Sequence, residues 1–405
     1  MAAPPVSDCE VAISGGGPVA LCLAELLAQS GISVRVFEQA AGLERDLRAS
    51  TFHPPTLDML DGIGLGEQMV RDGLICPDWQ VRMHPSGERA VFDLSVLAQD
   101  TAHPYRLQYE QWRLSELLLE RLAQRGTVDL RFGAAAVGFE QDDLGARLTV
   151  EDTQSGTRET VRARFVVGAD GARSLMRGAL GLAFEGKTYP ETTVLVTTPF
   201  AFGEHLAGLS NVSYCWKDNG NFSLLRVPGR WRVSLYPGDE TLVEEQLGEE
   251  AVEAALQEIV PRDTRYEVLE KRPYRVHQRI VPTYRVGRAV LAGDAAHLNN
   301  PSGGMGLNGG LHDAFELAEA LRAILRGGAR TDRLDLYDRR RRPVAHEQIL
   351  AQADRNRSRM RETDPARRVE ILAELQEIAA DRERLHAYLL RSSMIAGLRQ
   401  AALVA

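Results

Sequence analysis

The chain has 405 residues, of which 44% are apolar and 26% charged, and its 48 basic and 56 acidic side chains give a net charge of −8. At roughly 100–200 residues per domain, this length allows several folding units with large cores, and the composition excludes a disordered chain. The acidic balance disfavours nucleic acid as a partner, because phosphate backbones bind basic surfaces.

The chain opens with a predicted strand–helix–strand unit. An apolar strand at 9–13 is followed by a turn at Gly15-Gly16-Gly17 and by apolar residues at helical spacing up to Gly31. A second strand at 33–37 ends in Glu38. This order is typical of a βαβ unit in a parallel sheet.

The middle of the chain alternates between helix and strand patterns. Residues 73–105 hold short segments between proline and glycine turns, and residues 110–125 predict a helix. Further strands are predicted at 128–132, 146–151 and 164–168, and the last of them leads into Asp170-Gly171.

Residues 181–282 have a different character, because strand-like runs separated by turn residues predict an antiparallel sheet that forms a second layer for a ligand. The runs lie at 192–197, 211–216, 222–227 and 231–236, with a helix near 249–260. The chain then returns to an apolar strand at 289–292, a glycine-rich loop and a helix at 308–325.

Beyond Thr331 the pattern is helical and charged, with expected breaks at Pro343 and Pro365. We expect this tail to pack on the first layer or to form a dimer contact. The arginine run at 339–342 is interpreted as a solvated helix face.

Gly15-x-Gly17-x-x-Ala20 lies where a dinucleotide-binding fingerprint must lie, after a strand and at the start of a helix. The first glycine permits the tight turn, the second lets a pyrophosphate approach the backbone, and Ala20 is small enough for the third position. The helix start at Pro18 and Val19 directs its dipole at the pyrophosphate.

Glu38 stands at the tip of the second strand, about 20 residues beyond the glycines, where a carboxylate can accept hydrogen bonds from a ribose. Gln39 beside it is a further cofactor-binding candidate. A βαβ unit with these residues can bind either NAD or FAD, so a further motif is needed to distinguish the two cofactors.

A later block favours a flavin. Asp294 follows a predicted strand, and an aspartate there can bind the hydroxylated ribityl chain. The amides of the next helix start can face the pyrimidine edge of the isoalloxazine, where negative charge collects on reduction. The candidate cofactor-binding residues of this block are Gly293, Asp294, Pro301, Gly304, Gly306, Leu307 and Asn308.

Together with Asp170-Gly171, these blocks have the order and spacing of the GxGxxG, DG and GD motifs. They resemble those of the class A flavoprotein monooxygenases, the single-component FAD aromatic hydroxylases similar to p-hydroxybenzoate hydroxylase, over roughly residues 8–340. Arg48 resembles the family's arginine loop near the flavin, and Gln108 with Arg113 resembles its flavin-contacting segment. The short C-terminal stretch resembles the compact form of the family.

This resemblance implies a cycle in which NADH or NADPH reduces FAD, O2 adds to the flavin C4a atom, and the hydroperoxide hydroxylates an aromatic or polyketide-like small molecule. The protein would place the ring and keep water from it. The nicotinamide would dock transiently, because the chain holds one dinucleotide fingerprint. The implied assembly is a monomer or a homodimer.

The implied architecture is α/β, with a Rossmann-like FAD-binding domain, an inserted antiparallel-sheet substrate domain and a C-terminal helical tail. The expected boundaries are 1–75, 106–180 and 283–330 for the FAD-binding domain, 76–105 and 181–282 for the substrate-binding domain, and 331–405 for the tail.

No side chain is assigned a catalytic role, because the cofactor carries the chemistry. The candidates for lining the ring pocket are His53, Tyr214, Arg226 and Pro301, and on the predicted sheet also Trp216, Phe222 and Leu224. Alternate sheet residues should face the cavity, in a register that the sequence leaves open. Arg226 would favour an acidic or phenolate substrate. A backbone-bonded His53 and a structural His297 are competing interpretations.

Other flavin-dependent activities are compatible with the same motifs. The motifs do not separate ring hydroxylation from epoxidation or Baeyer–Villiger insertion, and a non-oxygenating FAD-dependent reductase differs by taking up no O2. A halogenase is disfavoured because Trp216 is followed by Lys-Asp-Asn rather than by a WxWxIP signature. A nucleotide sensor is disfavoured because all three FAD blocks are retained.

Four cysteines, at positions 9, 22, 76 and 215, have no CxxC spacing, so neither a metal site nor a disulfide framework is expected. The first eight residues lack the features of a signal peptide, and no window reaches the roughly 20 apolar residues of a membrane span. We therefore expect a cytoplasmic protein.

Overall fold

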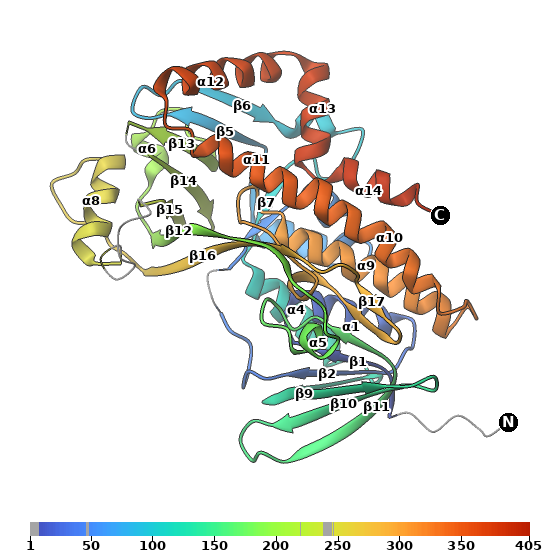
Figure 1. The fold of residues 1–405 in the computed structure, drawn as a ribbon. Helices are drawn as coiled ribbons and strands as arrows, with labels where there is room; N and C mark the ends of the chain where they lie inside the picture. The colour runs from blue at the N-terminus through green and yellow to red at the C-terminus, as the bar shows by residue number, and fades with distance from the viewer. Residues whose placement is uncertain (1–7, 46–47, 219, 238–244, 246) are drawn as a thin grey trace.

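The computed structural model describes residues 8–45, 48–218, 220–237, 245 and 247–405 (Figure 1). It confirms the predicted α/β architecture of a Rossmann-like sheet, an antiparallel sheet and C-terminal helices. Residues 1–7, on which the signal-peptide expectation rests, lie outside the described part. Across the described residues, no helix has the length and apolar character that crossing a bilayer requires.

The first sheet has eight strands and contains the predicted N-terminal βαβ unit. Its main path runs β17–β18–β11–β1–β2–β8, in which the pairs from β18 to β8 are parallel, while β10 and β9 extend antiparallel from β11. The strands are β1 (Cys9–Ser14), β2 (Val34–Glu38), β8 (Val128–Phe132), β9 (Ala134–Gln141), β10 (Ala146–Asp152), β11 (Arg158–Gly168), β17 (Arg285–Val286) and β18 (Ala289–Leu291).

Three helices pack against one another beside this sheet. The central helix, α1 (Pro18–Gln29), lies between α4 (Gln111–Leu122) and α9 (Gly306–Leu325). Leu23 and Leu27, which recur at helical spacing, are fully buried. Because of this packing, the first turns of α1 and α9 lie close together.

The second sheet also has eight strands and confirms the four predicted runs. Its order is β19–β16–β12–β15–β14–β13–β5–β6, and every pair is antiparallel except β13 with β5. The strands are β5 (Asp78–Met83), β6 (Arg89–Asp93), β12 (Glu185–Thr198), β13 (Val212–Lys217), β14 (Gly220–Val227), β15 (Arg230–Leu235), β16 (Glu270–Ile280) and β19 (His297–Leu298). The expected domain boundaries stay a prediction.

Short elements join the two layers. A three-stranded sheet in the order β3–β7–β4 connects the segment after Arg48 with the segment around Gln108. The strands of this small sheet are β3 (Thr51–Phe52), β4 (Leu74–Cys76) and β7 (Arg106–Gln108). The other short elements are α2 (Pro54–Asp61), α3 (Gly66–Asp72), the 3-10 helices η1 (Leu94–Leu97) and η2 (Gly293–Ala295), α5 (Leu175–Ala179), α6 (Phe202–His205) and α8 (Glu249–Ile259), of which α6 and α8 pack on the second sheet.

The expected helix break at Pro343 is wrong. This proline lies inside α10 (Arg333–Val344), which continues through a π-helical segment (Ala345–Leu350) into α11 (Ala351–Met360). Because proline has no amide hydrogen, the helix must absorb a lost hydrogen bond, and the wider π turn directly after Pro343 accommodates the irregularity without ending the helix. Pro365, in contrast, follows a break and starts the next helix.

Helices α12 (Pro365–Ala380) and α13 (Arg382–Ser392) turn back over the second sheet, at the top of Figure 1, and α14 (Ile395–Ala402) then packs against α10. Leu372 and Leu389 share a buried cluster with Trp79 and Phe92 of the sheet. Because α10 packs on α9, the tail contacts the first layer as expected, and its packing on the second sheet was not predicted. A dimer contact of the tail stays a prediction.

The interpretation of the arginine run as a solvated face is wrong for Arg341. Arg339 is exposed, but Arg341 is only 1% exposed. It lies on the side of α10 that packs against α9, where its Nε atom is 2.8 Å from Oδ1 of Asp313. A buried carboxylate therefore overrides the usual preference of arginine for solvent.

Candidate functional site

The glycine turn after β1 lies directly against the Asp170 segment. Gly15 has a φ of +107°, and a Cβ built on it would lie 2.3 Å from the carbonyl oxygen of Ala169. The Ala169 amide donates to the Ser14 carbonyl at 2.9 Å. Only glycine suits this position, so close backbone packing joins two of the three predicted motifs.

The start of α1 has the properties of a phosphate site. Gly17 is its N-cap residue in an extended conformation, Pro18 follows, and no side chain caps the helix. A Cβ built on Gly17 would meet no atom within 4 Å. Uncapped amides at a helix start with open space before them suit a bound pyrophosphate, so these residues fit the expected cofactor.

The turn at Gly293 lies beside the same helix start. Gly293 has a φ of +60°, and a Cβ built on it would lie 3.1 Å from Cγ2 of Val19. A Cβ on Gly310 of α9 would lie 2.7 Å from the same atom. All three motif segments therefore meet around the beginning of α1, although they are far apart in the sequence.

Asp294 is exposed, whereas its neighbours Gly293 and Ala295 are buried. Burial by the surrounding protein nevertheless raises the pKa of its carboxyl group, while His297 and Arg48 act in the opposite direction. The side chain is thus recessed among protein atoms but accessible. This combination suits hydrogen bonds with the hydroxyl groups of a ribityl chain.

A buried ionic network that the sequence analysis missed holds this turn in place. Asp313 of α9 accepts the Gly293 amide at 3.1 Å and contacts Nε2 of His297 at 2.7 Å and Nε of Arg341 at 2.8 Å. Burial tends to raise the pKa of Asp313, but His297 and Arg341 outweigh it and hold the pKa at about 2. His297 is therefore part of the support for the turn.

Asn308 ties the glycine-rich loop to the segment before α2. Its side-chain nitrogen donates to the carbonyl oxygens of Thr51 at 2.8 Å and Gly304 at 2.7 Å, and its Oδ1 accepts the His53 amide at 2.9 Å. No side chain caps α9, which begins at Gly306 with Leu307 buried next to it. The first amides of α9 can therefore serve a ligand.

The structure places His53 behind the glycine-rich loop and outside the cavity described below. Its Nε2 atom is 2.8 Å from the Gly303 carbonyl oxygen. Burial, with a further contribution from Arg106, lowers the pKa of His53 to about 3. The bond to the Gly303 carbonyl oxygen agrees with the interpretation of a backbone-bonded histidine, and a contact between His53 and the flavin ring stays a prediction.

Glu38 is engaged by backbone amides. Its Oε2 accepts the Gly16 amide at 2.6 Å and its Oε1 accepts the Ala40 amide at 2.8 Å, while Gln39 is exposed. Each carboxylate oxygen keeps a further acceptor lone pair, so a contact with a ribose stays a prediction.

Asp170 supports the turn after β11. Its Oδ2 accepts the Met176 amide at 3.1 Å and the Ser14 hydroxyl at 3.4 Å. Its Oδ1 is buried and has no hydrogen-bond partner among the described residues. A buried acceptor in this state, next to the glycine turn, indicates that a further polar group binds here.

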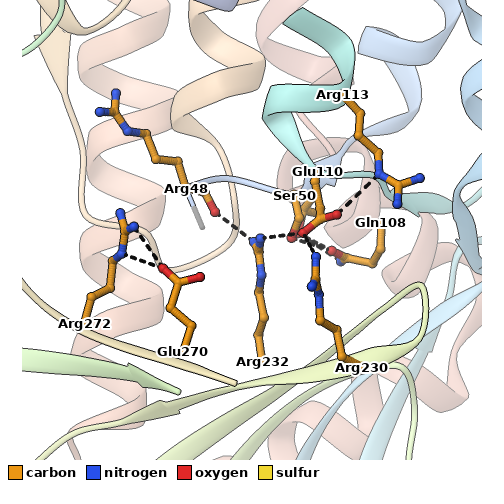
Figure 2. A network of polar contacts seen from close by, with 10 residues as sticks. Arg48, Ser50, Gln108, Glu110, Arg113, Arg230, Arg232, Glu270 and Arg272 are labelled. Atoms are coloured by element: carbon orange, nitrogen blue, oxygen red, sulfur yellow. Dashed lines mark hydrogen bonds and ion pairs between the residues drawn. The ribbon is translucent and has the colours of Figure 1, made fainter. Parts of the chain in front are cut away.

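Gln108 and Arg113 belong to a polar network between the first layer and strand β15 (Figure 2). Gln108 is buried and bonds to Ser50 and Thr51, each at 2.9 Å. Arg113 lies 3.4 Å from the buried carboxylate of Glu110. Both side chains hold the loop together, and their contact with a flavin stays a prediction.

Glu110 also joins this network to the second sheet. Arg230 contacts it at 2.5 Å and Arg232 at 3.4 Å, and Arg232 donates to the Arg48 carbonyl oxygen at 2.8 Å (Figure 2). The Arg48 guanidinium group forms an ion pair with Glu44. The backbone of the expected arginine loop is thus bound to the sheet.

A cavity lies where the second sheet, the glycine-rich loop and the tail helices meet. Of the predicted candidates, Tyr214, Phe222 and Pro301 line it. Arg226 does not, because it stands next to the hairpin at the end of β14 and is exposed. The described lining residues are Trp79, Val81, Arg106, Thr193, Tyr214, Asn221, Phe222, Ser223, Tyr236, Val276, Asn300, Pro301, Ser302, Gly303, Asn356, Arg357, Arg359, Met360, Arg361, Tyr388 and Ser392.

Sequence reasoning missed the part of this wall that comes from β7, α11 and α13. Arg106 is two residues before the candidate Gln108, but nothing in the local pattern shows which side chain faces the cavity. The residues of α11 and α13 were overlooked because the tail was expected on the first layer. Their charged helical pattern carries no signal for a cavity wall.

Comparison with known proteins agrees with these features. A family described as an FAD binding domain matches residues 8–352. Para-nitrophenol 4-monooxygenase from Pseudomonas sp. (strain WBC-3) is 37% identical over 392 residues, which cover 96% of each chain. The crystal structure of p-nitrophenol 4-monooxygenase PnpA from Pseudomonas putida DLL-E4 has a TM-score of 0.89 at 34% identity and covers 96% of this chain and 98% of that chain. Aklavinone-11 hydroxylase, crystallised with FAD and aklavinone, has a TM-score of 0.78 at 27% identity, over 88% of this chain and 70% of that chain.

Proposed function

Because this chain belongs to the FAD binding domain family, within the class A FAD-dependent aromatic hydroxylases, we propose that it hydroxylates an aromatic small molecule with NAD(P)H as reductant and O2 as oxygen source. It is a flavoprotein monooxygenase with FAD as its cofactor. When bound, FAD takes electrons from the nicotinamide and supplies activated oxygen to the substrate.

The residues around α1 and α9 would hold the cofactor. The helix start at Gly17 binds the pyrophosphate, Glu38 accepts from the ribose of the adenosine, and Asp294 accepts from the ribityl chain. The first amides of α9 stabilise negative charge at the pyrimidine edge of the ring. The network of Asp313 and Arg341 keeps the Gly293 turn in position for these contacts.

The cavity would hold the substrate. Pro301, Ser302 and Gly303 form one side of it, and they belong to the loop that leads into α9. A ring bound in the cavity therefore lies next to the expected flavin edge. Side chains from the tail helices cover this space and keep water from the reacting atoms.

One observation carries this proposal: the three motif segments meet at the start of α1, and the loop after Asp294 forms a wall of the cavity. The test is a screen of phenolic, pyridine and polycyclic compounds with FAD-loaded enzyme. We expect at least one compound to stimulate NAD(P)H oxidation together with O2 uptake and to gain one oxygen atom by mass.

Other outcomes of the screen would change the assignment. A product with a new epoxide or an inserted ester oxygen would indicate epoxidation or Baeyer–Villiger chemistry. Substrate reduction without O2 uptake would indicate a reductase. Protein that does not take up FAD would contradict the whole proposal.

A further inference from the structure

Arg106 is a buried cation that forms no ion pair with any residue the structure describes. It is 3% exposed, and its guanidinium group lies 5.0 Å from the ring centroid of Trp79. Its buried Nε atom has no hydrogen-bond partner among the described residues, and the polar contact of its guanidinium group is with the hydroxyl group of Tyr214, not with an acid. A buried charge is strongly unfavourable unless it is paired, so this group calls for an anion.

The ionisable neighbours of Arg106 do not provide that anion. They are Cys76 of β4, Tyr214 of β13, Tyr388 of α13 and His53 before α2. Burial raises the pKa of Cys76 to about 12, so this thiol is neutral near pH 7. Tyr214, Tyr388 and His53 contribute hydroxyl and imidazole groups rather than carboxylates. Among the residues that the structure describes, no acid therefore serves as the partner of Arg106.

The other charged side chains that line the cavity are also arginines. Its described lining contains four arginines and no aspartate or glutamate. Two of the arginines, Arg357 and Arg359, belong to α11, and Arg361 directly follows that helix. Arg359 donates to the Tyr388 hydroxyl at 3.1 Å, and Arg357 lies over the ring of Tyr189 at 3.9 Å. A cavity with this lining attracts anions and rejects cations.

Aromatic rings complete the wall beside Arg106. Trp79 stacks on Phe92 with a centroid distance of 4.1 Å, and Tyr214 approaches Trp79 edge-on at 6.0 Å. Both Trp79 and Tyr214 line the cavity. Arg106 also lies close enough to His53 to affect its pKa, and His53 bonds to Gly303 of the loop. The cation therefore stands between an aromatic surface and the expected flavin edge.

We propose that Arg106 is the counter-ion for an anionic group on the aromatic substrate, which restricts the enzyme to ionised phenols or aromatic carboxylates. This inference rests on the proposed function in that the cavity holds the aromatic ring. It goes beyond that function by naming the charge of the substrate and the residue that selects it.

The test uses FAD-loaded, oxidised enzyme without reductant, so that binding is measured without turnover. The probe is 4-nitrophenol, whose ionised form is recognised by its absorbance. We expect the bound probe to be ionised at pH values where the free probe is still neutral. Arg106→Gln should weaken binding of the ionised probe about 30-fold, or ~2 kcal/mol, and remove this preference.

Arg106→Lys and an exposed arginine provide the controls. Arg106→Lys keeps the positive charge, so it should keep the preference for the ionised probe. Arg265 forms an ion pair with exposed Glu250 and does not line the cavity, so Arg265→Gln should change the affinity by less than about twofold. Equal affinities of Arg106→Gln and the original enzyme for the ionised probe would overturn the proposal.

A second measurement needs no variant and therefore remains decisive if Arg106→Gln does not fold. The original enzyme should bind 4-nitroanisole, the methyl ether of the probe, at least about tenfold more weakly than 4-nitrophenolate. Comparing 4-nitrobenzoate with its methyl ester identifies whether a carboxylate is also accepted. If both neutral analogues bind as tightly as the anions while NAD(P)H-dependent oxygenation persists, this inference fails and the proposed function stands.

Discussion

The cofactor side and the cavity side of this molecule are built in different ways. On the cofactor side, glycine turns bring backbone segments into direct contact, as at Gly15 and Gly293. On the cavity side, the wall consists of single side chains from the sheet, the glycine-rich loop, α11 and α13. Backbone-built features need particular residue types at fixed spacing, whereas a side-chain wall accepts many sequences. The first kind of site is therefore readable in a sequence and the second is not.

The largest effect is expected where a buried ion pair supports the cofactor side. Arg341→Met leaves Asp313 buried with one charged partner fewer, so we expect the free energy of unfolding to fall by about 3–5 kcal/mol and FAD to be lost. Urea unfolding and the amount of bound flavin per chain measure this. Arg339→Met changes an exposed residue of the same run and should remain within about 0.5 kcal/mol. Equal stability of the two variants would show that the buried network does not support the turn.

A smaller effect isolates the cofactor contact from protein stability. A methyl group at Gly17 meets no protein atom within 4 Å but would enter the expected pyrophosphate site. Gly17→Ala should therefore change apoprotein stability by less than about 1 kcal/mol and lower FAD affinity by about 100-fold, or ~3 kcal/mol. Gly126→Ala is the matched control, because a Cβ there also meets nothing within 4 Å. Unchanged FAD affinity in Gly17→Ala would place the pyrophosphate elsewhere.

His53 lies where the cofactor side meets the cavity side, and we expect it to make the free energy of unfolding depend on pH. Its pKa is about 3 in the folded chain and about 6.5 when unfolded, so below pH 6.5 the unfolded chain binds a proton that the folded chain does not. Stability is therefore lost as the pH falls. Between pH 7 and pH 5, protonation of His53 in the unfolded chain should lower the free energy of unfolding by about 2 kcal/mol. We expect this part of the decrease to be absent in His53→Gln, whose side chain can still donate a hydrogen bond to Gly303.

Urea unfolding at the two pH values measures this difference. His205→Gln, at an exposed position, is the control. A pH dependence in His53→Gln that equals that of the original chain would show that His53 is not held neutral.

The smallest effect concerns the contribution of the tail to the cavity. Tyr388→Phe removes the hydroxyl that accepts from Arg359 and retains the ring. We expect KM to rise about threefold with little change in kcat, because a single hydrogen bond between side chains of the cavity wall contributes roughly 0.5–1.5 kcal/mol. Steady-state kinetics with the substrate found in the screen measure this. A large fall in kcat at constant KM would instead indicate that Tyr388 contacts the reacting atoms.

The βαβ unit, the four strands of the second sheet and the helix after the glycine-rich loop were predictable because each has a local signal. The alternation of apolar residues identifies strands, and the strict need for glycine at a positive φ marks Gly15 and Gly293. The later Asp294 block favoured a flavin, and the resemblance of the three motif blocks to a known family indicated the family. The local rules were wrong at Pro343, where a π-helical turn maintained the helix, and at Arg341, where a distant carboxylate kept the cation buried.

The sequence by itself therefore determined the parallel sheet, the three motif segments and the cofactor class, since these depend on residues close together in the chain. The tertiary structure alone decided that Arg106 faces the cavity while Arg226 does not, and that α11 and α13 close the wall. The reason is physical: which side chains share a cavity depends on strand register and helix packing between segments hundreds of residues apart, and no local pattern records those contacts.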